Sequence, residues 1–374
     1  MIKSPRYFQQ IALFISKSLV LSRIFFYRYF LFHFSCLREF QSLVSDLRVR
    51  SIFRRQKNEI YEMAWPSERF LAFKDMNRST AIVKQAFEHN LPDRLPRGEL
   101  WLGTNLLKKA NLEDNVKGHL ALIKHLGQDI LCLPLSNDLS TNKARGYRCF
   151  SLKELDEASK MSDLFVIALI EGPFQRLVGK KGLMNILVEW KRKMDEFEKE
   201  FNKERADVDV LIKRCLELSV DAVILADDLA GEHSPFIDPN EIRDLFSSYY
   251  TQMVSEIHSG HSYALFHSCG NITLLIPQLV SFGFDGLAGI QHRTNDLVSV
   301  KEKYGSCLTL MAGIDGEILG AGEMSLSEVM EIERLVKSLA PGGGFILCSS
   351  SGLYSGDFLE RIQEIYRITD ELAF

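Results

Sequence analysis

The sequence predicts an α/β protein, a (β/α)8 TIM barrel at residues 76–374 that follows a basic, aromatic-rich N-terminal extension. In the barrel region, short apolar runs alternate with longer amphipathic segments, and eight such runs occur. Near-continuous apolar strands are typical of a parallel sheet that is buried on both faces. Eight strands that alternate with helices over about 300 residues match the size of a closed barrel. No run is followed by a glycine-rich dinucleotide-binding turn, so a doubly wound open sheet is the second choice.

Eight apolar runs are the expected strands, and half of them end in Gly, Asp or Ser. In chain order they are GELWLGT (98–104), DILCLPL (129–135), LFVIALIEG (164–172), DAVILADDL (221–229), YALFHSCG (263–270), GLAGI (286–290), LTLMAGID (308–315) and GFILCSSS (344–351). Between them, residues 240–260 and 325–344 have the pattern of helices. The second opens with Ser-Leu-Ser-Glu and closes with Pro-Gly, which are helix start and stop signals. The charged run at 191–209 is expected to be the solvated face of a helix.

Residues 1–75 differ in composition from the rest and form the expected extension. They hold 13 Lys and Arg against 6 Asp and Glu, and their first half is dense in aromatic residues. Lys17, Arg23 and Arg28 interrupt the apolar stretch, which therefore falls short of the about 20 uncharged residues of a membrane span. Three interpretations stay open: a basic segment that contacts a membrane or directs transport, a partner-binding arm, or a stretch upstream of the true start. The last is preferred, because the sequence from Met76 reads as a domain start.

The bulk composition excludes several classes of protein. With 46% hydrophobic and 25% charged residues, the chain resembles a soluble globular protein with a sizeable core. Its net charge of −4 gives no reason to expect a nucleic-acid partner. Seven scattered cysteines, an odd number, favour a reducing compartment. We therefore expect a cytoplasmic protein in which a special cysteine is catalytic or binds a metal.

Polar side chains gather where the expected strands end, which is where the active sites of (β/α)8 barrels lie. In chain order these candidates are Glu99, Asp227, Asp228, His267, Cys269, Gln291, His292, Asp315 and Cys348. The four carboxylates, Glu99, Asp227, Asp228 and Asp315, are expected to bind substrate. For Asp227 and Asp228 a helix N-cap pair is the alternative.

His267 and Cys269 form the most informative pair. Residues at i and i+2 of a strand face the same side, so both side chains would point together into the mouth of the barrel. Closure of the barrel would bring in Cys348 from the eighth strand. One histidine and two thiolates with an open fourth position are a recognised catalytic zinc set, and these soft ligands favour zinc over magnesium or calcium. The alternative for Cys348 is a core cysteine, which is what we expect of Cys132.

Several sequence blocks resemble a known family. LFHSCGNITLLIPQLVSFGFDGL, GSCLTLMAGIDGEILGAG and LAPGGGFILCSSSGLYSGD look like the uroporphyrinogen decarboxylase superfamily, and the likeness covers about residues 76–372. Within it, a His-x-Cys followed by a late Cys is similar to the methylcobamide:coenzyme M methyltransferase branch. The decarboxylases proper use no metal and carry an arginine-rich Arg-Gln-Ala-Gly-Arg-Tyr stretch near the start. The corresponding region here is RGELWLGTNLL, with Arg97 as its only arginine.

The resemblance implies a zinc-dependent enzyme that moves a methyl group from a methylated corrinoid to a small thiol such as coenzyme M. The donor would be a methylcobamide carried by a partner corrinoid protein. His267, Cys269 and Cys348 would be the zinc ligands and the catalytic residues. The segment GIQHRTND offers no obvious carboxylate at the fourth position, which leaves Gln291 or His292 as candidates. Coordination to zinc deprotonates a thiol that is mostly protonated at neutral pH.

Two alternatives stay open. The first is uroporphyrinogen decarboxylase itself or another metal-free decarboxylase, in which Asp227 or Asp228 polarises a pyrrole-like group. The second is a non-catalytic corrinoid-binding or membrane-tethering accessory that works through residues 1–75. Metal analysis discriminates the first alternative from the zinc enzyme, and deletion of the extension tests the second.

Overall fold

Seven parallel strands form one sheet in which the spatial order follows the chain from β1 to β7. The computed structural model describes residues 78–136, 146–320 and 322–372. The strands are β1 (Ile130–Leu135), β2 (Phe165–Glu171), β3 (Ala222–Ala226), β4 (Tyr263–His267), β5 (Gly286–Ile290), β6 (Thr309–Ile314) and β7 (Phe345–Ser349). All their residues except Glu171 and Tyr263 are buried, as expected of a parallel sheet that is covered on both faces.

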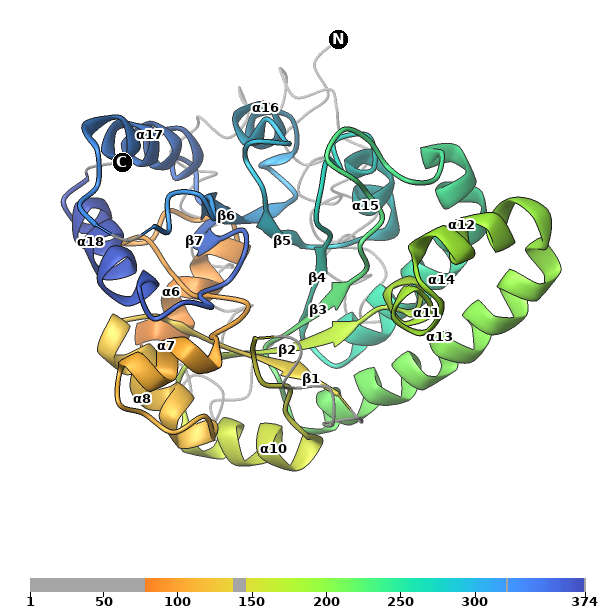
Figure 1. Cartoon of the computed structure of the whole chain (residues 1–374), viewed down its shortest axis with the longest axis horizontal. Coiled ribbons are helices and arrows are strands. Elements are labelled where there is room, and N and C mark those ends of the chain that lie inside the picture. Colours follow the sequence, from red (N-terminus) through yellow and green to blue (C-terminus); the bar gives the residue numbers. More distant parts are fainter. Residues whose placement is uncertain (1–77, 137–145, 321, 373–374) are drawn as a thin grey trace, which may run out of the picture. The chain divides into compact units, whose positions relative to one another are not determined.

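Most of the helices lie outside the curled sheet (Figure 1). Ahead of β1 come α6 (Arg78–Phe87), α7 (Thr104–Lys109) and α8 (Val116–Leu126), and between β1 and β3 come α10 (Leu152–Met161), α11 (Pro173–Lys181), α12 (Leu183–Arg192) and α13 (Met194–Glu217). The remaining helices are α14 (Pro239–Ser259), α15 (Ile276–Phe282), α16 (Leu297–Tyr304), α17 (Leu326–Leu339) and α18 (Phe358–Asp370). This alternation confirms the predicted α/β class.

The two helices that the sequence predicted most clearly begin at capping residues. α14 starts after Asp238, whose carboxylate accepts from the backbone N–H of Asn240. α17 starts after Ser325, which forms a capping box with Glu328, so two otherwise unpaired N–H groups gain partners. The charged run at 191–209 falls mostly on α13, as predicted. That helix buries apolar residues at helical spacing, among them Phe197, Phe201 and Val208, and turns most of its charges outward. Glu204 is the buried exception and pairs with Lys180.

The first expected strand, residues 98–104, does not form, so the sheet has seven regular strands where eight were predicted. A short irregular segment takes its place between β7 and β1. Leu347 donates its backbone N–H to Pro96 O at 2.9 Å, Gly98 donates to Leu347 O at 3.1 Å, and Asp129 donates to Arg97 O at 2.8 Å. The next backbone donor on β7, Ser349 N, instead bonds the Glu99 carboxylate at 3.1 Å. Because a side chain takes this donor, the ladder ends after residues 96–98.

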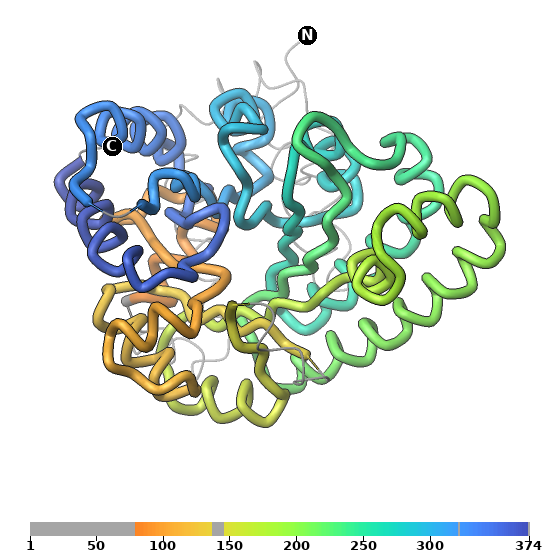
Figure 2. Tube along the Cα trace, in the orientation of Figure 1, coloured from red at the N-terminus to blue at the C-terminus, as the bar shows by residue number. Residues whose placement is uncertain are grey.

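The curl of the sheet brings the two ends of the described chain together. Figure 2 shows the chain advancing around the sheet, from the first described helices to the last. α7 packs against α18, and α6 packs against β7. The parallel order and the curl are those of a TIM-like barrel.

The strands bury side chains on two sides. Those on one side pack against the surrounding helices, for example Leu131, Val166 and Ala168. Those on the other side form a second cluster inside the curl, which includes Cys132 and Cys348. As predicted, Cys132 is a core cysteine with 5% of its surface exposed.

All described elements belong to the unit Met76–Phe374. In the part of the chain that the structure describes, no helix is long and apolar enough to cross a membrane. The predicted extension, residues 1–75, lies outside the described residues, so its predicted separation from the barrel and its role stay predictions.

Candidate functional site

A cavity of about 320 Å³ opens at the carboxyl ends of the strands. Its described lining consists of Trp101, Tyr147, Leu169, Glu171, Gln175, Ala226, Asp228, His267, Cys269, Gln291, Ser350, Ser351 and Tyr354. Most of these residues come from the ends of β2, β3, β4, β5 and β7 and from the segments that follow, whereas Trp101 lies in the irregular segment before β1 and Tyr147 lies between β1 and α10. This is the end of the sheet at which barrel enzymes place their chemistry.

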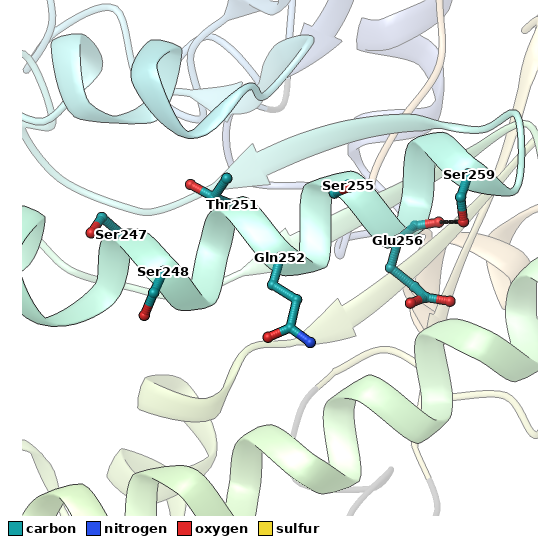
Figure 3. A pocket seen from close by; sticks show the side chains of 7 residues that line it. All are labelled: Ser247, Ser248, Thr251, Gln252, Ser255, Glu256 and Ser259. Carbon is teal, nitrogen blue, oxygen red and sulfur yellow. Dashed lines mark hydrogen bonds between the residues drawn. The ribbon is translucent and has the colours of Figure 1, made fainter.

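A second hollow, of about 560 Å³, lies elsewhere and offers little chemistry. Figure 3 shows its lining on the outer face of α14: Ser247, Ser248, Thr251, Gln252, Ser255, Glu256 and Ser259. All of these side chains belong to one helix, and Glu256 alone among them carries a charge. We therefore place the candidate site at the strand ends.

His267 is the last residue of β4 and is held in one tautomer. Its Nδ1 lies 2.7 Å from Ala288 O on the neighbouring strand β5. A carbonyl oxygen can only accept, so Nδ1 carries the proton and Nε2 keeps a free lone pair. Burial lowers the pKa of His267, with partial opposition from the Asp228 charge. The ring is therefore a neutral imidazole whose Nε2 is free to bind a metal ion.

Cys269 and Asp228 complete a group of three possible ligands with His267. The Cys269 Sγ lies 3.9 Å from His267 Nε2, and one ligand atom from each of the three residues lies within 4.8 Å of the others. Loss of solvent around Cys269 and the nearby Asp228 carboxylate together raise the pKa of this thiol to about 12, although the residue stays exposed to the cavity. Without a cation the thiol therefore keeps its proton at neutral pH.

Hydrogen bonds between the backbone of one loop and side chains of its neighbour hold the group in place. β3 and β4 are paired with Ala226 opposite His267, so the residues that follow both strands lie side by side. Asp228 accepts from Cys269 N at 2.7 Å, and Ser268 Oγ accepts from Leu229 N at 3.0 Å. Gln291 accepts from Gly270 N at 2.9 Å. The positions of Asp228 and Cys269 are thus determined by the loop backbone rather than by a ligand.

Cys348 does not join this group within 4.8 Å. It faces the inside of the curl, fully buried, and its Sγ lies 3.1 Å from Ser349 O and 3.9 Å from Glu99 Oε2. Burial raises the pKa of the thiol well above its usual range, and the Glu99 charge adds to the effect. The structure thus brings two of the three predicted zinc ligands together, and the part of Cys348 in the site stays a prediction.

Glu99 lies behind the cavity rather than in its lining. Its carboxylate accepts from Ser349 N, Ser349 Oγ and Tyr366 Oη. Burial raises the pKa of Glu99 to about 7, and the donated hydrogen bonds oppose this rise.

Asp227, Asp315 and His292 also lie outside the described lining of the cavity and have partners of their own. Asp227 is fully buried and accepts from Gln175 N at 2.7 Å and Tyr250 Oη at 2.8 Å. His292 lies 2.7 Å from Glu331 Oε1 and 3.7 Å from Asp315 Oδ2. Asp228 is the one predicted substrate-binding residue that lines the cavity. Gln291 is the one candidate for the fourth ligand that lines it.

Comparison with known proteins now decides the family. The family model described as uroporphyrinogen decarboxylase matches residues 139–372, which is more than half of the chain. The chain belongs to the uroporphyrinogen decarboxylase family. No curated protein matches its sequence.

A solved structure shares the fold of this family member. A methyltransferase from Methanosarcina mazei is 17% identical, with a TM-score of 0.59, over 78% of this chain and 98% of the other. A sugar phosphate isomerase/epimerase from Parabacteroides distasonis is 14% identical, with a TM-score of 0.41, over 72% of this chain and 92% of the other. The first similarity supports the barrel-like fold, and the second is too weak to carry an argument.

Sequence reasoning missed the aromatic side of the site in this uroporphyrinogen decarboxylase family member. The rings of Trp101, Tyr147 and Tyr354 form a row: Trp101 lies 5.9 Å from Tyr147, which lies 5.9 Å from Tyr354. The Trp101 ring also meets His267 edge-on at 5.0 Å. These aromatic residues lie in irregular segments without a periodic pattern, so only the fold reveals that they are neighbours.

Proposed function

We propose that this chain is a zinc-dependent methyltransferase that moves a methyl group from a methylated corrinoid to a small thiol. The observation that carries the proposal is the group of Asp228, His267 and Cys269 in the cavity at the strand ends. Family membership and the fold shared with a methyltransferase support it.

The donor atoms of this group fit zinc. An imidazole nitrogen with its proton fixed on the other nitrogen, a thiol and a carboxylate are all ligands that zinc accepts. The Ala288 carbonyl fixes His267 in the required tautomer. When bound, zinc would deprotonate a thiol acceptor and leave its sulfur electron-rich. Cys348 lies deeper in the same curl and is the proposed further ligand.

The size of the cavity limits what it can hold. A space of about 320 Å³ accommodates a small molecule, so the corrinoid would stay on its partner protein and present its methyl group at the mouth. The acceptor sulfur would attack the methyl carbon of this donor, so that an S–C bond would form while the Co–C bond would break with its electron pair left on cobalt. The chain's own residues position the acceptor and hold its sulfur beside Cys269.

A metal-free decarboxylase is less well supported by this lining. Among the described lining residues, Glu171 and Asp228 carry charge, and both are acidic. A substrate with many carboxylates needs cationic partners in the site, and these described positions supply none.

Metal analysis and a model reaction test the proposal. Protein purified with zinc should hold about one ion per chain, and His267→Ala and Cys269→Ser should lose it while keeping their circular dichroism. With methylcobalamin as donor and mercaptoethanol as acceptor, the wild type should release cob(I)alamin and form the methyl thioether. Zinc-free protein that decarboxylates a porphyrinogen would overturn the proposal.

A further inference from the structure

The loop that follows β4 is bonded to its surroundings at three consecutive peptide units around Cys269. Cys269 N donates to the Asp228 carboxylate at 2.7 Å, and Gly270 N donates to Gln291 Oε1 at 2.9 Å. Gly270 O accepts from Asn295 Nδ2 at 2.9 Å. The first bond reaches the loop after β3, and the other two reach the segment after β5. Cys269 is thus held from both strands that neighbour its own.

Asn295 uses both ends of its side-chain amide in this arrangement. The residue is 1% exposed. Its Nδ2 donates to Gly270 O at 2.9 Å and to Gln291 O at 3.0 Å, and its Oδ1 accepts from Ile272 N at 2.9 Å and from Thr273 Oγ1 at 3.3 Å. A backbone N–H can only donate and a carbonyl oxygen can only accept, so these partners fix the orientation of the amide. Neither leucine nor an ionised aspartate, which are of similar size, could serve both ends.

The chain turns sharply directly after Cys269. Gly270 has a φ of +80°, and a Cβ on it would lie 2.4 Å from Gly231 O. Glycine adopts many backbone conformations with similar ease, so the residue itself does not hold the turn in this one. The bonds that Gln291 and Asn295 make to the peptide groups of Gly270 provide that constraint.

We propose that Asn295 is a positioning residue, which holds the loop so that Cys269 Sγ lies beside His267 Nε2 and can share a metal ion with it. The two atoms are 3.9 Å apart. Asn295 is not among the described residues that line the cavity, so it acts through Cys269. The inference rests on the proposed zinc-dependent function and adds a residue to that site. Gln291 has a related task, because its Oε1 is bonded to Gly270 N.

Two variants and a matched control test this role. Asn295→Ala removes every bond of the amide, whereas Asn295→Asp keeps an acceptor for Ile272 N and loses the donor to Gly270 O. The control is Ser262→Ala at the other end of β4. It removes a buried bond of similar kind, from Ser262 Oγ to Val220 O at 2.6 Å. All three changes should lower the melting temperature, and the Asn295 variants alone should alter Cys269.

The first measurement uses metal-free protein. The rate at which iodoacetamide alkylates Cys269, followed by mass spectrometry of the peptide that contains it, should rise severalfold in both Asn295 variants, because the released loop exposes the sulfur more often. The rate should stay at the wild-type value in Ser262→Ala. Equal rates in the wild type and the Asn295 variants would overturn the proposal.

The second measurement uses the metal. The dissociation constant for zinc, measured with a chromophoric chelator, should rise about tenfold in the Asn295 variants and stay unchanged in Ser262→Ala. With cobalt(II) in place of zinc, the sulfur-to-metal charge-transfer band should lose intensity per bound ion in the Asn295 variants, because Cys269 leaves the ion while His267 and Asp228 remain. Full intensity in these variants would contradict the proposal, since a merely structural role predicts it.

Hydrogen exchange of the wild type decides if neither Asn295 variant folds. The amides of Gly270 and Ile272, which bond Gln291 and Asn295, should exchange much more slowly than those of the exposed residues Glu232 and His233. Rapid exchange would show that the loop is not held. If the wild type binds no zinc, the proposed function fails, while alkylation and exchange still report on Asn295. If zinc binds equally well to the wild type and the Asn295 variants, the proposed function stands and the positioning role fails.

Discussion

Replacement of Glu99 by glutamine should flatten the pH dependence of stability in the metal-free protein. Glu99 is 2% exposed, and burial raises its pKa from an ordinary value near 4.5 to about 7. Between these two values the folded state binds more protons at this site than the unfolded state. The stability that the neutral carboxyl contributes is therefore fully present below pH 4.5 and is lost as the pH rises through 7.

The size of this loss follows from the shift. One pKa unit corresponds to about 1.4 kcal/mol, so the rise from 4.5 to about 7 corresponds to about 3 kcal/mol between pH 4.5 and pH 8. Glutamine keeps an acceptor oxygen for Ser349 N and Tyr366 Oη but cannot ionise. The cost of its extra N–H groups is the same at every pH, so the slope with pH, rather than the stability at one pH, isolates the carboxylate.

Urea unfolding with a chelator present, from pH 4.5 to pH 8, measures this slope. The wild type should lose stability over the range faster than Glu99→Gln. Glu232→Gln, a change at an exposed loop position, should follow the wild type. Burial also raises the pKa of Asp227 to about 7, so part of the wild-type slope should survive in Glu99→Gln and disappear when Asp227→Asn is added. Parallel curves for wild type and Glu99→Gln would refute the reasoning.

Three further changes test the site and the domain division. Gly289→Ala places a Cβ 2.9 Å from His267 Nδ1 at a position with a φ of +66°, so zinc affinity measured with a chromophoric chelator should fall on the order of tenfold while the fold persists. Cys348→Ser should lower the zinc content, because Cys348 is the proposed further ligand. Cys132→Ser should keep the metal, because Cys132 is a core cysteine whose pKa is raised by burial. Equal zinc content in the wild type and both variants would remove Cys348 from the ligand set. A chain that begins at Met76 should stay folded and active in the methylcobalamin assay, and loss of folding would show that residues 1–75 are structural.

The sequence predicted the strands well where burial on both faces leaves a plain apolar signal. Seven of the eight expected runs contain β1 to β7, because each strand of a covered parallel sheet must be apolar along its whole length. The strand predicted at residues 98–104 does not form, and the cause is local. Gly98 lies so close to β1 that a Cβ would come within 2.5 Å of Ile130, and the Glu99 carboxylate takes the donor of Ser349. The run at residues 98–104 is apolar apart from its buried acid, so its sequence pattern cannot be told apart from that of a buried strand.

The candidate ligands differ in how far along their strands they lie. His267 ends β4, and Cys269 and Asp228 each lie two residues beyond the end of a strand, on neighbours whose register pairs Ala226 with His267. Cys348 lies one residue before the end of β7, with β5 and β6 between its strand and β4. The rule that residues i and i+2 share a face of a strand does not say how close each lies to the open end of the sheet. The sequence could therefore pair His267 with Cys269, but it could not show that Asp228 is a better candidate ligand than Cys348. After the end of β7, Ser350 and Ser351 line the cavity instead of Cys348. For Cys348 to bind the same ion as His267 and Cys269, the end of β7 must move, or the ion must bind deeper than the mouth of the cavity.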